Sequence, residues 1–196
     1  MEELRPLDKI LEPDDRNRYR NTTLPLLHEI ASEIRLNEAI PALVQDQFTI
    51  AKNAYLYSWF WFPFQAPALL YSILAIELGL QIRVKEAKPS MFAGERDPTL
   101  FHLLLFALQQ RWILDAGFDI DVSDDFQVAE KIAKQFPNIP SDQRYSYNLL
   151  DVLVYLRNDL AHGTYMLVPA VGQLLARGAE LINQLFPAIT RGAAAP

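Results

Sequence analysis

Apolar residues recur at helical spacing over most of this chain. Proline residues stand near the start of several apolar stretches, where the missing N–H group costs least and the fixed φ angle suits a helix. The pattern predicts long helices over about 22–37, 41–60, 67–85, 98–116, 141–163 and 164–186. Because no stretch has the alternation typical of strands, we predict an all-α fold, a single-domain antiparallel bundle of about five main helices plus short satellite helices.

Capping residues predict where several of these helices begin and end. Asp97, which precedes a proline, predicts a helix start, and Gly117 predicts the end of the same helix. Ser141 or Asp142 is expected to cap a later helix, which a glycine at position 163 should end. The bundle is expected to cover 23–190, after an N-terminal extension over 1–22 and before a flexible tail over 191–196.

A short satellite helix is expected in the stretch DDFQVAEKIAKQF. Asp124 and Gln127 have the spacing of a capping box, in which side chains at the two positions satisfy free N–H groups at the helix start. Val128, Ile132 and Phe136 share one face of the expected helix. This apolar face should pack on the bundle.

One uncharged stretch, residues 53–76, is long enough to imitate a membrane span. Pro63 and Pro67 interrupt it near the middle, and a proline inside a helix removes a hydrogen bond and introduces a clash. We therefore expect two amphipathic segments that meet at a tight corner, and no membrane insertion. The aromatic cluster YLYSWFWFPF within this stretch is expected to pack in the core or at a dimer interface.

The amino-acid composition and net charge exclude several classes of protein function. The chain has 196 residues, no cysteine and a formal net charge of −6. Without cysteine there is no thiol nucleophile and no zinc–thiolate site, and the charged N-terminal stretch does not resemble a signal peptide, so we expect a cytoplasmic protein. The acidic balance argues against a general polyanion-binding surface, so any contact with nucleic acid must be local.

The stretch YLRNDLAHGTY places three polar residues in an otherwise apolar helical pattern. Arg157 falls on the same stripe as core leucines, and Asn158 and His162, four residues apart, share an adjoining face. A buried guanidinium requires an acceptor, and Glu77, which lies among apolar residues at helical spacing, is the candidate partner. From the residues alone, this pair is equally a buried salt bridge between two helices or part of a site.

The sequence LRNDLAHG resembles the signature of the HEPN superfamily (higher eukaryotes and prokaryotes nucleotide-binding domains), an arginine followed after four to six residues by a histidine. Arg157, Asn158 and His162 occupy its places. The resemblance implies an all-helical bundle and a metal-independent endoribonuclease, commonly a homodimer in which two copies of the motif face each other. It also implies a role in toxin–antitoxin or defence systems, with RNA as substrate, an antitoxin protein as partner and no cofactor.

The implied reaction is attack of a ribose 2′-hydroxyl on the adjacent phosphate. His162 would be general base or acid, Arg157 would hold the phosphate with its guanidinium fork, and Asn158 would orient the histidine or the helix end. One branch of the superfamily carries a tyrosine two residues after the histidine, which its antitoxin modifies. Here Tyr165 comes three residues after His162, so it departs from that branch's spacing and is kept only as a supporting candidate of the site.

Alternative functions stay open at this point. A non-catalytic helical module that binds a nucleotide or a partner protein would use Arg157 and Glu77 as a structural ion pair.

Other candidate sites are metal sites. Six residues have the spacing of the ligands in an EF-hand calcium loop: Asp119, Asp121, Ser123, Asp125, Gln127 and Glu130. Asp124 stands where such a loop needs glycine, so a solvated acidic loop is the expected reading. His28 and His102 have no second metal ligand at suitable spacing and are expected to be core or boundary residues.

Overall fold

The computed structural model describes residues 4–119, 128–163 and 170–188. Within them the protein is an all-α bundle without strands, as predicted. The longer helices are α2 (Leu24–Glu33), α3 (Ala42–Tyr57), α4 (Gln65–Ala87), α5 (Leu100–Gln109), α7 (Arg144–Ala161) and α8 (Val171–Leu185). Two helices are short, α1 (Asp15–Tyr19) and α6 (Glu130–Gln135). The 3-10 turns are η1 (Leu7–Lys9), η2 (Phe62–Phe64), η3 (Pro89–Phe92), η4 (Asp115–Gly117) and η5 (Ser141–Gln143).

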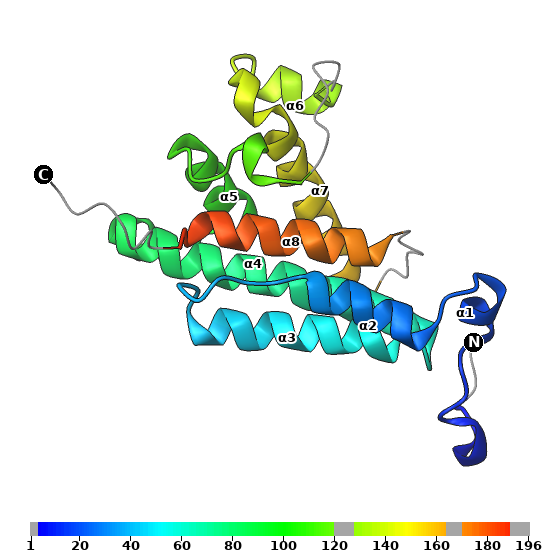
Figure 1. Cartoon of the computed structure of the whole chain (residues 1–196). Coiled ribbons are helices and arrows are strands. Elements are labelled where there is room, and N and C mark those ends of the chain that lie inside the picture. Colours follow the sequence, from blue (N-terminus) through cyan, green and yellow to red (C-terminus); the bar gives the residue numbers. More distant parts are fainter. Residues whose placement is uncertain (1–3, 120–127, 164–169, 189–196) are drawn as a thin grey trace, which may run out of the picture.

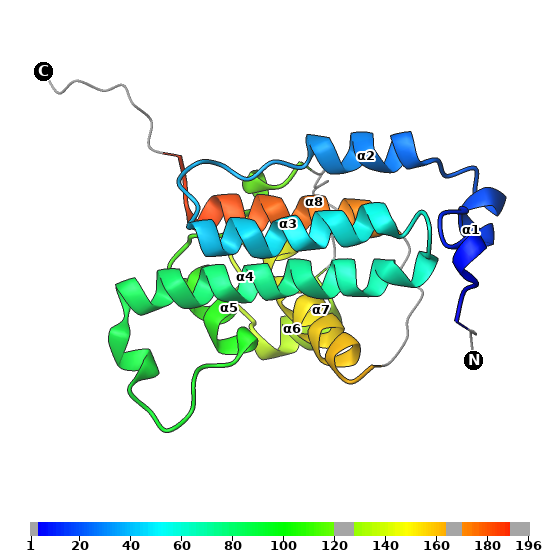
Figure 2. The same ribbon diagram turned by 90° about the horizontal axis from the view of Figure 1, so that it is seen from below.

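The helices form layers on both sides of α4 (Figures 1 and 2). One side of α4 is covered by α3 and α8, with α2 outside them, and the other side by α5 and α7. The colours in Figure 1 show that α3 runs antiparallel to α4, whereas α8 runs in the same direction as α4. In the same view α7 crosses the long axis of α4 and α8 steeply, so that α7 meets α4 over a short region.

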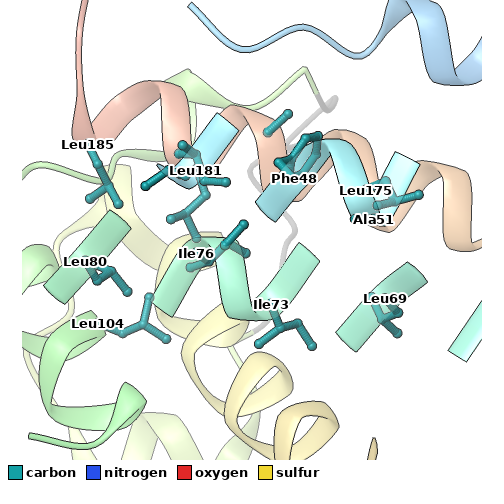
Figure 3. Packing of buried hydrophobic residues seen from close by; sticks show 14 of the residues in the cluster. Phe48, Ala51, Leu69, Ile73, Ile76, Leu80, Leu104, Leu175, Leu181 and Leu185 are labelled. Atoms are coloured by element: carbon teal, nitrogen blue, oxygen red, sulfur yellow. The ribbon is translucent and has the colours of Figure 1, made fainter. Parts of the chain in front are cut away.

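The core is centred on α4, which contacts helices on both of its sides. Ile73 and Leu80 of α4 are fully buried, and Figure 3 shows their side chains between those of α3, α5 and α8. Helix α4 is apolar nearly all round rather than on one stripe, which is the pattern of a helix enclosed by neighbours. Burial of one such side chain contributes about 2 kcal/mol, so this centre supplies much of the driving force for folding.

The corner between α3 and α4 forms where the two prolines predicted a break. Helix α3 ends at Tyr57, and α4 begins at Gln65 after the η2 turn, so Pro67 lies within the first turn of α4 rather than before it. The aromatic cluster divides here, because Phe62 is buried whereas the Trp61 side chain is 43% exposed. By length and composition Phe62–Ala87 could cross a membrane, but half of its most apolar window is buried in the bundle, and core helices pass the same test.

The N-terminal extension packs against this corner through buried polar groups. Asp14 accepts hydrogen bonds from the backbone N–H groups of Arg16 and Phe62, at 3.0 Å each. Asn17 is buried and donates its side-chain amide to the carbonyl oxygens of Ser58 and Trp59, at 2.7 and 3.0 Å. These bonds satisfy backbone groups of the corner that no helix satisfies, and they fix the extension to the bundle.

The predicted end of α5 at Gly117 was wrong, because the helix ends at Gln109. Arg111 adopts a left-handed conformation with φ of 58°, and the N–H of Trp112 donates to the Ala107 carbonyl at 3.0 Å. This hydrogen bonding is that of a Schellman motif, which ends a helix and is usually built on glycine. The predicted N-cap Asp97 was also wrong, because Thr99 precedes the first helical residue.

The start of α7 is capped from outside the helix. Neither Ser141 nor Asp142 caps it, since Ser141 begins the η5 turn and Asp142 pairs with Arg111. Instead, buried Asp115 of η4 accepts from the Tyr145 and Ser146 N–H groups, at 3.0 and 2.9 Å. A carboxylate here satisfies free donors and lies favourably at the positive end of the helix dipole. Helix α7, which carries the polar motif, is thus positioned by a tertiary contact.

The satellite helix is shorter than predicted. Helix α6 begins at Glu130, and its N-cap, Ala129, offers no side-chain cap. The proposed capping residues Asp124 and Gln127 lie outside the described residues. Ile132 is buried, and Val128 and Phe136, which lie just outside α6, pack against the core, so the predicted packing on the bundle is confirmed but not a shared helix face.

Candidate functional site

Helix α7 carries the polar motif at its C-terminal end, as the sequence predicted. His162 is the C-cap, and its backbone N–H donates to the Asn158 carbonyl at 3.0 Å. Gly163 follows with φ of +73°, and its N–H donates to the Leu160 carbonyl at 3.2 Å. Glycine adopts this left-handed conformation without the penalty that a Cβ atom brings. The helix end therefore fixes the backbone position of His162.

Arg157 pairs with Glu77 across the interface between α7 and α4. The distance from Arg157 Nε to Glu77 Oε2 is 3.5 Å. The side chain of Arg157 is 39% exposed and that of Glu77 is 14% exposed. The arginine is thus more than half buried, and part of its guanidinium surface is open to solvent. Because the Arg157 side chain is partly exposed, an anion from solvent can still approach its guanidinium group.

Asn158 and His162 are exposed, whereas Arg157 is directed to Glu77. Among the described residues, neither the Asn158 side-chain amide nor the His162 imidazole has a hydrogen-bond partner. The structure therefore places the three residues on one helix end, with Arg157 against α4 and the other two at the surface. Tyr165, the supporting residue suggested by the sequence, lies outside the described residues.

Tyr155 is a further polar group on this part of α7 that the sequence reasoning missed. Hydrogen bonding to the Asp159 carboxylate, together with the negative charge of that group, raises the pKa of Tyr155. The two residues are four apart, a spacing that places side chains next to each other on a helix and that could have revealed the pair. Tyr155 is 56% exposed, so Tyr155 and Asp159 lie on the same open surface of α7 as His162.

The chemistry available at this helix end is binding of an anion and proton transfer. A guanidinium offers two parallel donors that match a phosphate, and an imidazole can act as a general base or a general acid. Within the described residues, no group of three His, Asp or Glu side chains that could hold a metal ion occurs. Of the calcium-loop candidates, Asp119 is exposed and Glu130 pairs with Lys134 at 2.7 Å. The other four, Asp121, Ser123, Asp125 and Gln127, lie outside the described residues.

The two remaining histidines lie at the surface, not in the core. His28 is exposed on α2, and His102 is exposed on α5, where its Nδ1 lies 2.8 Å from the Thr99 hydroxyl. A surface hollow of about 930 Å³ lies elsewhere, between the N-terminal extension and the α3–α4 corner. Its lining includes Ile10, Trp61 and Phe64 but no residue of α7, so it is separate from the motif.

Comparison of the chain with known protein families, with curated proteins and with solved structures finds no match. The functional reading of the site therefore depends on the motif, the helical fold and the geometry described above.

Proposed function

We propose that this protein is a metal-independent endoribonuclease of the HEPN type, with its site at the C-terminal end of α7. The observation that carries the proposal is the arrangement of a partly exposed Arg157 and an exposed His162 at one helix end. In this proposal the protein is cytoplasmic, acts without a cofactor and belongs to a toxin–antitoxin or defence system with an antitoxin protein as partner.

The proposed reaction is a transesterification within the RNA strand. A base removes the proton of a 2′-hydroxyl, and the resulting oxygen attacks the adjacent phosphorus while the bond from phosphorus to the 5′-oxygen breaks. An acid protonates the leaving 5′-oxygen, so the products are a 2′,3′-cyclic phosphate and a free 5′-hydroxyl. Arg157 stabilises the negative charge that develops on the phosphate, and Asn158 orients His162 or the RNA.

The reaction requires both a base and an acid, and each chain supplies one histidine at this site. A homodimer that brings two helix ends together supplies the pair. The exposed face of α7 supports such an interface, because Val152 and Tyr155 are 44% and 56% exposed and precede His162 on one stripe. The residues at 152, 155, 159 and 162 are spaced three, four and three apart, which is the spacing of helix–helix seams.

The test is cleavage of single-stranded RNA by the purified full chain in the presence of EDTA. We expect products with 2′,3′-cyclic phosphate ends, and a loss of about a hundredfold or more in rate for His162→Ala, because proton transfer is removed. Arg157→Lys should also lose activity, because lysine lacks the fork that holds a phosphate. His28→Ala, an exposed histidine on α2, is the matched control and should cleave like the wild type.

A second candidate function is a non-catalytic binding module, which the Arg157–Glu77 pair itself favours. In that case the pair only holds α7 against α4. Arg157→Ala would then lower the free energy of unfolding by about 1 kcal/mol, because the pair is partly exposed to water. Wild-type protein would show no RNA cleavage under any condition, and His162→Ala would be indistinguishable from it in every assay.

A further inference from the structure

A second polar feature lies where α4 ends, away from the residues of the motif. Between positions 83 and 112 the sequence has five basic and three acidic residues, whereas the whole chain has a net charge of −6. The structure gathers three of the basic side chains over aromatic rings. This cation–ring cluster consists of Arg83, Lys85, Lys88, Trp112, Phe92 and Phe106.

Each cation of the cluster lies over one ring. The guanidinium carbon of Arg83 is 5.1 Å from the centre of the Trp112 ring. Lys85 Nζ is 6.0 Å from the centre of Phe92, and Lys88 Nζ is 5.5 Å from the centre of Phe106. Such contacts are attractive and hold long side chains in place, which lowers the entropy cost of using them in binding.

The two lysines have positive charge available for a ligand. Lys85 and Lys88 are exposed, and the described part of the chain offers neither of them a carboxylate partner. Arg83 is different, because it pairs with Glu86 at 3.6 Å while its buried Nε has no hydrogen-bond partner. Two other exposed lysines are neutralised, since Lys131 pairs with Asp151 and Lys134 pairs with Glu130.

The helix dipole explains only part of this arrangement. A cation in the last turn of a helix is favourable, because the C-terminal carbonyl groups carry partial negative charge. That effect accounts for Lys85, but it does not account for partly exposed rings beside the cations. Cations next to aromatic rings are the combination by which proteins hold single-stranded nucleic acid, with phosphates on the cations and bases stacked on rings.

Arg83 and Lys85 of the cluster lie on α4, the helix that also carries Glu77, the partner of Arg157. From Glu77 to Lys85 is eight residues, a rise of about 12 Å along α4. Figure 2 shows that the segment after α4 and the C-terminal end of α7 both lie on the side of α4 opposite α3. We infer that Lys85 and Lys88 bind the phosphate backbone of a single-stranded RNA, an inference that builds on the proposed function by locating substrate binding outside the catalytic motif.

The test measures binding separately from cleavage. A fluorescein-labelled oligouridylate is titrated with full-length protein carrying His162→Ala, and its anisotropy is followed at several salt concentrations. Reversal of both lysine charges, Lys85→Glu with Lys88→Glu, should weaken binding about tenfold or more. It should also lower the slope of log K against log salt by about 1.4, because two phosphate contacts are lost.

The matched control reverses two exposed lysines that already have carboxylate partners, Lys131→Glu with Lys134→Glu. It changes the net charge by the same amount and should leave affinity within about twofold of the His162→Ala parent. Equal losses in both double variants would show that binding follows net charge and would overturn the inference. Unchanged affinity and salt slope after reversal of Lys85 and Lys88 would overturn it as well.

Two further readouts separate this inference from the proposed function. If wild-type protein binds the oligouridylate through the two lysines but never cleaves RNA, the ribonuclease proposal fails and the binding site stands. A fluorescein-labelled oligoglutamate peptide is titrated in the same way. If it binds more tightly than the oligouridylate, and if reversal of the charges of Lys85 and Lys88 abolishes its binding, the cluster binds an acidic protein and the assignment to RNA is wrong.

Discussion

Buried carboxylates in this protein accept hydrogen bonds from backbone groups that lack partners in their own helices. Asp14 accepts from the Phe62 N–H, and Asp115 accepts from the N–H groups that open α7. Asp14 also pairs with Arg16 of its own helix, whereas Glu77 pairs with Arg157 of a different helix. The first two residues are therefore explained by structure alone, whereas the Arg157 side chain remains 39% exposed beside its partner.

The pH dependence of the N-terminal extension follows from Asp14. Burial favours the neutral form of this carboxyl, but the hydrogen bonds from Arg16 and from the Phe62 N–H outweigh burial and lower its pKa from 3.8 to about 2. A lowered pKa means that the charged form stabilises the fold. This stability is fully present above pH 3.8 and is lost as the pH falls through about 2.

We expect Asp14→Asn to lower the free energy of unfolding at neutral pH by about 1 kcal/mol, since Arg16 is partly exposed and water screens the pair. The difference from wild type should shrink as the pH falls below 3.8. Denaturant unfolding at several pH values measures the loss of stability and its pH dependence. Hydrogen exchange of the Phe62 amide reports the loss of the hydrogen bond to Asp14. Asp15→Asn, at a side chain 93% exposed, should change neither, and a pH-independent effect of Asp14→Asn would refute the explanation.

At the scale of elements, small residues set how closely helices approach. A Cβ atom added at Gly178 of α8 would lie 2.5 Å from the Ser72 hydroxyl oxygen of α4, and its next neighbours would be 3.6 Å or more away. Ser72 is fully buried. At this point of the parallel packing of α8 on α4, the obstacle to a larger residue at position 178 is therefore a single atom, the Ser72 hydroxyl oxygen.

Gly178→Ala should lower the free energy of unfolding by about 1 kcal/mol in the wild-type background, because the new methyl group overpacks the interface. In a Ser72→Ala background the same change should raise it, by up to about 1 kcal/mol, because alanine is the better helix former and the clash is gone. Urea unfolding of the four proteins measures the coupling. The same effect of Gly178→Ala in both backgrounds would contradict the predicted contact.

At the scale of the whole molecule, the proposed chemistry requires two chains. The bundle leaves apolar side chains exposed on several faces, and those on α7 share the helix with His162. An interface there would bring two helix ends together, whereas an interface elsewhere would leave each site with one histidine. The oligomeric state and the activity are thus expected to change together.

We expect wild-type protein to sediment as a dimer at micromolar concentration. Val152→Asp combined with Tyr155→Asp should shift it to a monomer and abolish RNA cleavage, because charges would face each other across the α7 interface. Leu43→Asp, at a side chain 67% exposed on α3, is the matched control and should stay dimeric and active. A wild-type monomer with full cleavage activity would rule out the two-histidine mechanism.

Local sequence determined the fold class, the corner near Pro63 and the end of α7 before Gly163, because the apolar pattern sets the helix period while prolines and glycines end helices. The same pattern suggested Glu77 as the partner of Arg157, because both positions fall on apolar stripes and a buried charge requires an opposite one.

Only the tertiary structure decided features that depend on residues distant in sequence. The cap of α7 comes from Asp115, about thirty positions before the helix start, so the local capping signals at Ser141 and Asp142 were misleading. The end of α5 was mispredicted because Arg111 takes a conformation usually left to glycine. The cluster at Lys85 and Lys88 likewise forms only when α4, η3 and α5 meet, since no local pattern aligns a cation with a distant ring.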